Sequence, residues 1–161
     1  MKKLVIVLLL VVSFCVGCDK IKEIIGGDDG RTPEALLDKY VDGFMTSDPD
    51  KLRDVVPDFM YKAMPEKFTK SYLEERFEHE KNHFGDDMKA SYELKEKKHL
   101  EGNDLKDINQ KIQDYFKTNE TASDCYYLDG TMTLTGSKDV DPDPLDSYYC
   151  KYDGTWYLII G

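Results

Sequence analysis

The stretch YYCKYDGTWYLII, residues 148–160, decides the fold of the C-terminal half of this chain. At its centre, Asp153-Gly154 is a pair of residues that readily adopts the positive φ angles of a two-residue hairpin turn. The flanking segments, residues 148–152 and 155–160, are rich in aromatic and β-branched side chains, which favour strands. The pattern therefore predicts a β-hairpin at the end of the chain.

Two more strands are expected before this hairpin. Residues 126–135 alternate between apolar and polar side chains, and so do the residues from Met88 to Leu94, with His99 near the end of that strand. A period of two is typical of a strand with one buried face. Between residues 126–135 and the hairpin, the polar, Asp- and Pro-rich segment Gly136–Asp146 is expected to be a loop.

Helical patterns precede and interrupt these strands. Thr32-Pro33 and Ser47-Asp48-Pro49 each combine a capping side chain with a proline suited to the first helical position. Further helices are expected to begin near Phe59, near Ser71 (ending at Gly85) and near Asn103. The predicted fold class is therefore α+β, with N-terminal helices packed on a curved antiparallel sheet.

The N-terminus carries a secretion signal. Lys2 and Lys3 precede an apolar run that is shorter than the roughly 20 residues a stable membrane-spanning helix needs. The run ends at Cys15-Val16-Gly17-Cys18, and this order resembles a bacterial lipoprotein signal, in which lipid joins the final cysteine and cleavage occurs just before it. The alternatives are an ordinary signal peptide cut elsewhere and a short uncleaved anchor.

These observations divide the chain into three parts. Residues 1–17 are the expected lipoprotein signal peptide, residues 18–31 the lipidated Cys18 with a flexible, Gly- and Asp-rich tether, and residues 32–161 one domain. The expected partner of Cys18 is the lipid bilayer. The expected location is the cell membrane, with the domain lipid-anchored on the extracytoplasmic face.

Charge excludes several classes of partner. The net charge of the 161-residue chain is −10, and it becomes −12 when Lys2 and Lys3 leave with the signal peptide. Because the sequence has no basic stripe, we expect no binding to nucleic acid and no broad contact with anionic lipid headgroups. No Gly-rich phosphate loop or Cys/His metal spacing is present, so no cofactor is expected.

Two cysteines remain for the folded domain. In an oxidising compartment Cys125 and Cys150 are disulfide candidates, and the alternative is two separate buried thiols. In the predicted hairpin Cys150 lies opposite Tyr157, so Cys125 reaches Cys150 only if residues 126–135 pair with the other side of residues 148–152. Such a bridge would close a loop of about 25 residues and contribute about 3 kcal/mol.

The order of these elements resembles that of the NTF2-like (cystatin-like, cone-shaped) superfamily, and in particular its small bacterial lipoproteins. The resemblance rests on the helix starts at Thr32-Pro33-Glu34 and at residues 47–52, on Tyr92–Lys98, on the helix from Asn103, and on residues 152–159. It implies a sheet curled around helices, leaving a cone whose mouth binds a small molecule or a partner segment. It also implies that a homodimer through the sheet is an open alternative.

One motif suggests metal chemistry. His79-Glu80-Lys81-Asn82-His83 matches H-E-x-x-H, in which two histidines one helical turn apart bind zinc and the glutamate acts as a general base. However, Lys81 intervenes between the ligands, no third ligand follows at the extended spacing, and the surrounding residues are highly charged. A solvated helix face is therefore the favoured interpretation, and no metal site is predicted.

The resemblance also suggests where acid–base chemistry would be found. Enzymes of this superfamily, such as isomerases and dehydratases, place an Asp or His, often with a Tyr, inside the cone. Here Asp129 lies on the strand face of Tyr127, and His99 lies near the end of the first strand. Several tyrosines and Trp156 could line a binding mouth, although packing in a sheet also explains them: Tyr126, Tyr127, Tyr148, Tyr149, Tyr152 and Tyr157.

Weighing these features, we expect a non-enzymatic lipoprotein that binds a small ligand or an extracellular protein partner. The first alternative is an extracytoplasmic enzyme that uses the cone as its active site. A zinc peptidase built on His79, Glu80 and His83 is a distant second alternative.

Overall fold

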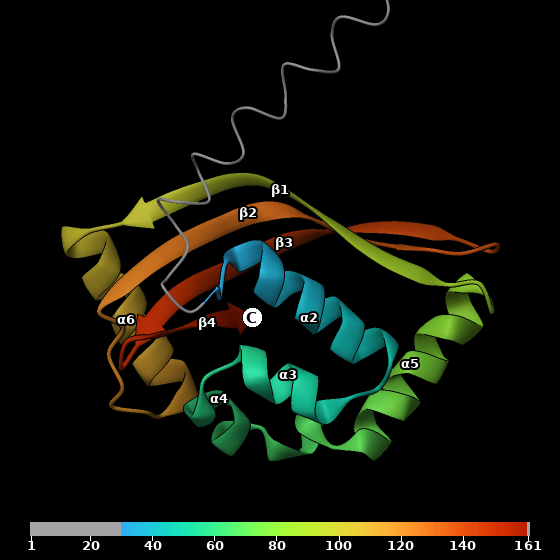
Figure 1. Cartoon of the computed structure of the whole chain (residues 1–161), viewed down its shortest axis with the longest axis horizontal. Coiled ribbons are helices and arrows are strands. Elements are labelled where there is room, and N and C mark those ends of the chain that lie inside the picture. Colours follow the sequence, from blue (N-terminus) through green and yellow to red (C-terminus); the bar gives the residue numbers. More distant parts are fainter. Residues whose placement is uncertain (1–29, 161) are drawn as a thin grey trace, which may run out of the picture.

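The computed structural model describes residues 30–160 as a mixed α+β fold, with helices first and then a four-stranded antiparallel sheet interrupted by one helix (Figure 1). The elements, in chain order, are α2 (Pro33–Met45), α3 (Pro49–Val55), α4 (Asp58–Ala63), the 3₁₀ helix η1 (Pro65–Phe68), α5 (Lys70–Phe84), β1 (Lys89–Leu100), α6 (Gly102–Phe116), β2 (Asp124–Thr135), β3 (Val140–Tyr152) and β4 (Thr155–Ile160).

The predicted helix starts are confirmed. The Thr32 hydroxyl accepts a hydrogen bond from the Ala35 N–H, and Pro33 occupies the first helical position of α2. The Asp48 carboxylate accepts from two N–H groups at the start of α3, where Pro49 follows it. In both helices a side-chain oxygen satisfies backbone donors that have no partner within the helix.

The sheet has the strand order β1-β2-β3-β4, and its strands arch over α2 (Figure 1). The Asp153-Gly154 turn joins β3 to β4, with positive φ at both residues, and Cys150 lies opposite Tyr157 as predicted. A β-bulge interrupts the β1–β2 pairing between Leu94 and Glu96. At the bulge β1 passes so close to Gly130 that a Cβ there would collide with the Glu93 carbonyl oxygen.

The prediction of a loop from Gly136 to Asp146 is wrong for most of its length. Strand β3 begins at Val140, and only four residues separate it from β2. The backbone N–H and C=O groups of even-numbered residues in β3 point toward β4. Strand β4 pairs with β3 only from Ser147 onward, so the backbone nitrogens of Pro142 and Pro144 point toward an edge that has no partner strand. A proline is tolerated there because no partner strand requires its missing N–H.

The core lies between the helices and the sheet. Leu37 of α2 is buried together with Leu128, Tyr149 and Leu158 from three neighbouring strands. Aromatic side chains close one end of the core. Phe59 of α4 packs against Phe116 of α6 and Tyr152 of β3, with ring centroids 5.6 and 5.2 Å apart respectively. Among the described residues, no helix is long and apolar enough to cross a membrane.

Candidate functional site

The register of the sheet separates the two acid–base candidates of the sequence. Asp129 shares a face with Tyr127 and Tyr148, whereas His99 shares the other face with Tyr126. Strict alternation along β1 would have put His99 on the side of Asp129. The extra residue in the bulge reverses the alternation, so these two side chains lie on opposite sides of the sheet.

The face that carries His99 is the one that α2 covers. The Tyr92 hydroxyl donates a 2.8 Å hydrogen bond to Asp38, and Lys97 forms an ion pair with Glu34. The Tyr149 hydroxyl donates to the Arg31 carbonyl at the start of the domain. Burial, together with the Asp38 carboxylate, raises the pKa of Tyr92 well above its usual range.

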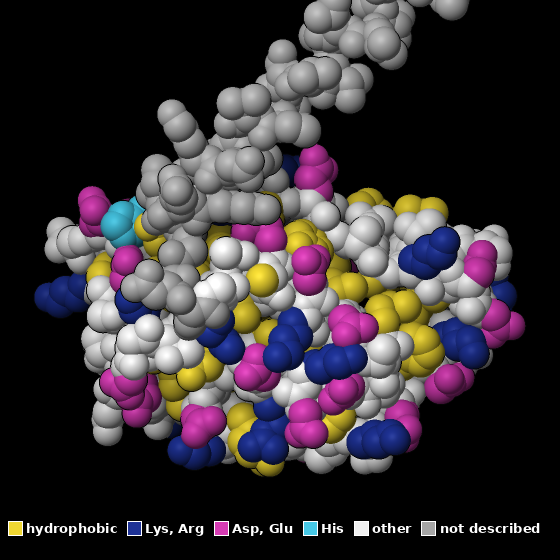
Figure 2. Space-filling view, in the orientation of Figure 1, with side chains coloured by type: hydrophobic (Ala, Val, Ile, Leu, Met, Phe, Trp, Pro, Cys, Tyr) yellow, Lys and Arg dark blue, Asp and Glu magenta, His cyan; other side chains and the backbone are white. Residues whose placement is uncertain are grey.

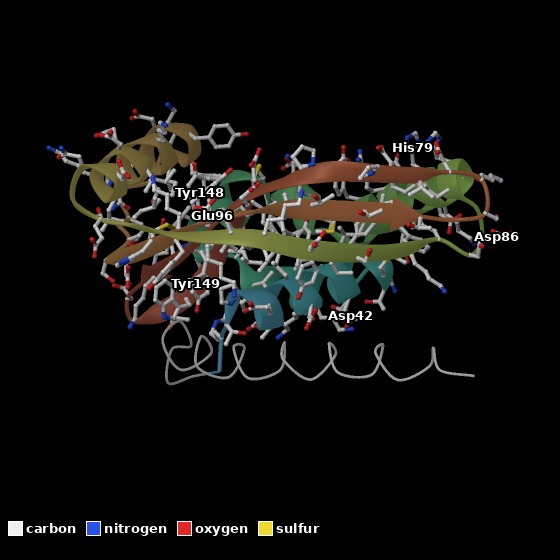
Figure 3. The ribbon with its side chains drawn as sticks, turned by 90° about the horizontal axis from the view of Figure 1, so that it is seen from above. Asp42, His79, Asp86, Glu96, Tyr148 and Tyr149 are labelled. Carbon is white, nitrogen blue, oxygen red and sulfur yellow. A yellow bond between two sulfur atoms is a disulfide. The ribbon has the colours of Figure 1, made fainter. Side chains whose placement is uncertain are left out.

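The opposite face is only partly covered. Helices α4 and α6 bury the end that holds Tyr152 and Cys125, and the remainder is exposed or half-buried. We call this remainder the open face and define it by Glu96 of β1, Tyr127 and Asp129 of β2, and Asp146 and Tyr148 of β3. Figure 3 looks across the sheet and shows Tyr148 and Tyr149 on its two different sides.

Three carboxylates form a row across the open face. Glu96 lies opposite Asp129, and Asp129 lies opposite Asp146, on three successive strands. The Tyr127 hydroxyl donates a 2.6 Å hydrogen bond to Asp146, which raises the pKa of Tyr127 to about 12. The Tyr127 and Tyr148 rings are 5.5 Å apart between centroids. The arrangement combines negative charge with two aromatic rings, both of which attract cations.

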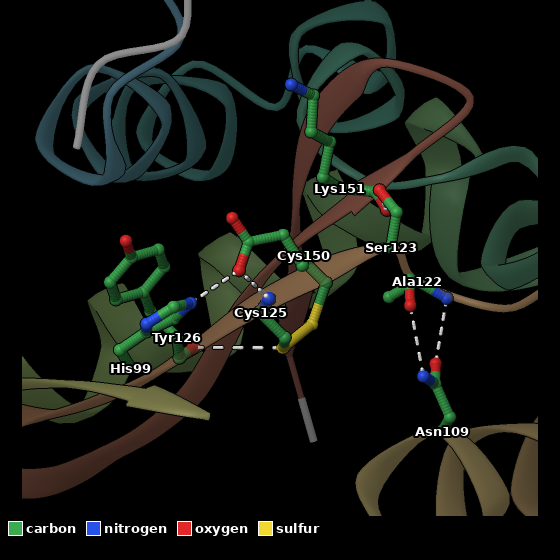
Figure 4. The surroundings of a disulfide bond; sticks show 9 residues. His99, Asn109, Ala122, Ser123, Cys125, Tyr126, Cys150 and Lys151 are labelled. Atoms are coloured by element: carbon green, nitrogen blue, oxygen red, sulfur yellow. Dashed lines mark hydrogen bonds and ion pairs between the residues drawn. A yellow bond between two sulfur atoms is a disulfide. The ribbon is translucent and has the colours of Figure 1, made fainter. Parts of the chain in front are cut away.

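A second cluster lies at the end of the helix-covered face. His99 Nε2 is 2.7 Å from Asp124 Oδ1, and His99 Nδ1 is 3.2 Å from a Glu101 carboxylate oxygen (Figure 4 shows the Asp124 contact). The imidazole ring stacks on Tyr126 with centroids 4.6 Å apart. We call these four residues the sheet-end cluster. It is open to solvent, since 41% of the His99 side chain is exposed.

Sequence reasoning missed the partners of His99. Asp124 lies just before the predicted strand and Glu101 just after the first one, so neither carries a recognisable motif. Their meeting depends on the pairing of His99 with Tyr126 beyond the bulge. Only the β1–β2 register could have predicted that these residues meet, and the sequence pattern did not specify that register.

The remaining tyrosines and Trp156 do not line one mouth. Tyr149 and Trp156 stack with centroids 4.2 Å apart, and both are buried. Tyr152 is also buried, and its hydroxyl has no hydrogen-bond partner among the described residues. Tyr157 is half-buried and lies under the Arg31 guanidinium. Packing therefore explains these four aromatic side chains.

The predicted disulfide is present between Cys125 and Cys150 (Figure 4). The two residues lie directly opposite each other on β2 and β3, with their Cα atoms 4.0 Å apart. They occupy a non-hydrogen-bonded position, where facing side chains approach most closely. Both are fully buried, on the face of the sheet opposite to His99 and Tyr126. Cys18, the predicted lipid attachment residue, lies outside the described residues, as do the whole signal peptide and most of the tether.

The H-E-x-x-H segment lies on α5. His79 is exposed, Glu80 forms a 2.8 Å ion pair with Arg76, and His83 Nε2 is 3.0 Å from an Asp139 oxygen (Figure 3 labels His79). Within residues 30–160, no group of three or more His, Cys, Asp or Glu side chains is placed to hold a metal ion. The motif therefore has the placement of a solvated helix face.

A shallow pocket of about 380 Å³ lies beside α6. Its lining includes Leu105, Asn109, Gln113 and Ala122. Asn109 is buried and bonds through both the nitrogen and the oxygen of its amide: it donates to the Ala122 carbonyl at 3.1 Å and accepts from the Ala122 N–H at 2.8 Å. Gln113 is likewise bonded to the segment after the helix. The polar groups of this wall fix the α6–β2 connection.

Comparison of the chain with protein-family models, with curated proteins and with solved structures finds no match.

Proposed function

We propose that this chain is a lipid-anchored extracytoplasmic protein that binds a partner or a small ligand without catalysis. In this proposal the signal peptide of residues 1–17 is removed, lipid joins Cys18, and residues 18–31 tether the domain to the membrane surface. The domain is an NTF2-like cone in which a curved antiparallel sheet encloses helices.

The observation that carries the location is the buried Cys125–Cys150 disulfide. Disulfides persist in oxidising compartments outside the cytoplasm and are rare inside it. The proposed secretion signal and the pairing of the two domain cysteines therefore both fit a location outside the cytoplasm. A cysteine that receives lipid would take no part in that pairing.

The tether limits how far the domain can stand from the bilayer. Arg31 lies 13 positions after Cys18, which allows a span of at most about 45 Å when the chain is fully extended. Arg31 is held by the Trp156 carbonyl, which accepts its 2.7 Å hydrogen bond, and by an ion pair with Asp54. A tether ending there would bring the domain within reach of other molecules on the same surface.

Binding is favoured over catalysis because the acid–base candidates do not converge. Asp129 and His99 lie on opposite faces of the sheet, and the space between α2 and the sheet is filled by apolar side chains such as Leu37 and Leu128. An enzyme of this type would need an Asp or His beside a Tyr in a water-excluding site.

One observation favours a second candidate, an extracytoplasmic enzyme. The sheet-end cluster places His99 between two carboxylates and on a tyrosine ring, a set of groups that can transfer protons. His99→Gln keeps a hydrogen-bonding side chain but cannot act as an acid or base. Retention of cellular function by this variant supports binding, and its loss supports the enzyme.

The anchor is tested by metabolic labelling with an alkyne analogue of palmitate in cells that express the wild type or Cys18→Ala. We expect label and membrane association for the wild type alone. Equal labelling of both proteins would overturn the anchor.

A further inference from the structure

We propose that the open face binds a cationic segment of a partner protein, with lysine or arginine side chains lying over the Tyr127 and Tyr148 rings and among the carboxylates of Glu96, Asp129 and Asp146. This inference rests on the proposed binding function and specifies the chemistry of the partner.

The first argument is the cost of the carboxylate row. Like charges directly opposite each other on neighbouring strands destabilise a sheet, and here three lie in succession on β1, β2 and β3. In the part of the chain that the structure describes, none of the three forms an ion pair with a lysine or arginine. Lys98 lies opposite Tyr127 on the same face, but its ammonium is 3.2 Å from Asp104. An external cation would therefore relieve a repulsion that no ion pair to the row relieves.

The alignment of the three carboxylates distinguishes this row from the rest of the surface. The face shown in Figure 2 carries both signs of charge intermixed. On α2 and α3, for example, Lys51 is 2.6 Å from Asp42, and Lys39 is 2.6 Å from Asp54. Other exposed carboxylates, such as Glu75 and Glu78 of α5, also lack an ion pair, but those of the open face lie directly opposite one another on neighbouring strands.

The aromatic rings supply the second argument. Tyr127 and Tyr148 are half-buried side chains whose rings lie side by side next to the row. A cation over a tyrosine face gains about 0.5–1 kcal/mol at an exposed site. The 2.6 Å bond from the Tyr127 hydroxyl holds Asp146 beside the same rings. One ammonium or guanidinium group can therefore contact a ring and a carboxylate together.

The other ways to cover this sheet are disfavoured. A second copy of the chain would bring identical carboxylate rows face to face, which opposes self-association. A strand added to the free edge of β3 would meet Pro142 and Pro144, which offer no N–H groups there. The geometry thus points to a segment that lies over the face, and the charge points to a basic one.

The test measures binding of a fluorescein-labelled decapeptide of alternating lysine and threonine to the full-length protein in mild detergent, by fluorescence polarisation at physiological ionic strength. The same peptide with glutamate in place of lysine is the probe control. The wild type is expected to bind only the basic peptide.

Matched variants separate the open face from total charge. Glu96→Gln with Asp129→Asn removes two carboxylates from the row, and Glu75→Gln with Glu78→Gln removes two exposed carboxylates from α5. We expect the first pair to weaken binding about tenfold and the second to change it less than about twofold. Tyr148→Ser should weaken binding with no change of charge.

Misfolding cannot explain the expected result, because removal of a like-charge contact should leave the melting temperature of the first pair unchanged or raised. Equal weakening by both pairs, or no binding of the basic peptide to the wild type, overturns the inference. Calcium that binds the row while the peptide does not also overturns it. If the wild type takes up no palmitate label but still binds the basic peptide, the proposed anchor is wrong and the binding site on the open face is supported.

Discussion

Removal of the Cys125–Cys150 disulfide is expected to destabilise the domain by about 3.5 kcal/mol. The bridge spans 25 positions of the sequence. The chain-entropy relation for a loop of that size gives about 12 cal/mol/K of entropy removed from the unfolded chain, or about 3.5 kcal/mol at 25 °C. For a domain of roughly 130 residues this corresponds to a fall in melting temperature of about 10–13 °C.

The variant for this test is Cys125→Ala with Cys150→Ala. Both sulfurs are fully buried, so alanine keeps the site apolar and leaves only a small void. Thermal unfolding is followed by circular dichroism, with and without the reductant TCEP. TCEP should lower the melting temperature of the wild type, because the reductant reaches the buried bridge when the domain unfolds. The melting temperature of the double alanine variant should be the same with and without TCEP.

Two results would refute this reasoning. The first is a melting temperature of the double variant within about 2 °C of the wild type. The second is a count of two free thiols from Cys125 and Cys150 in unreduced, denatured protein. A loss well above 3.5 kcal/mol would instead indicate that the bridge also supports the packing of α6.

Three further changes test other parts of the structure. Asn109→Leu leaves the buried N–H and carbonyl of Ala122 without partners and should cost about 2–4 kcal/mol in urea unfolding. Tyr152→Phe removes a buried hydroxyl that has no described partner, so stability should rise by about 1 kcal/mol; a loss on urea unfolding would show that the hydroxyl is bonded. The Asp54 carboxylate accepts a 2.6 Å hydrogen bond from Lys39, which lowers the pKa of Asp54. It therefore stabilises the fold above the ordinary pKa of aspartate and loses this effect as the pH falls through its own pKa, so Asp54→Asn should be destabilising at pH 7 and neutral in strong acid, as measured by unfolding across a pH series.

The sequence predicted those features that depend on local chemistry. The Asp153-Gly154 turn determined the register of the last hairpin, in which Cys150 lies opposite Tyr157. The predicted meeting of Cys125 with Cys150 also required the β2–β3 pairing, which the structure contains. Capping side chains and prolines located the starts of α2 and α3.

What the sequence could not predict depends on tertiary context. Pro142 and Pro144 indicate a loop by composition, yet a strand accepts them because β4 is too short to pair with that part of β3. The bulge in β1 reverses the side on which His99 lies, and alternation alone gives the opposite answer. The open face was likewise out of reach, since its carboxylates come from three strands whose alignment only the fold supplies.

The central claim is that a lipid-anchored domain with an oxidised cysteine pair lies outside the cytoplasm. Intact-mass spectrometry of the protein extracted from cell membranes tests signal removal, lipid attachment and cysteine oxidation together. The account predicts a mass that lacks residues 1–17, includes lipid on Cys18, and is two hydrogens lighter than the reduced form. A chain that retains residues 1–17, one that begins at Cys18 without lipid, or one with two reduced cysteines would contradict it.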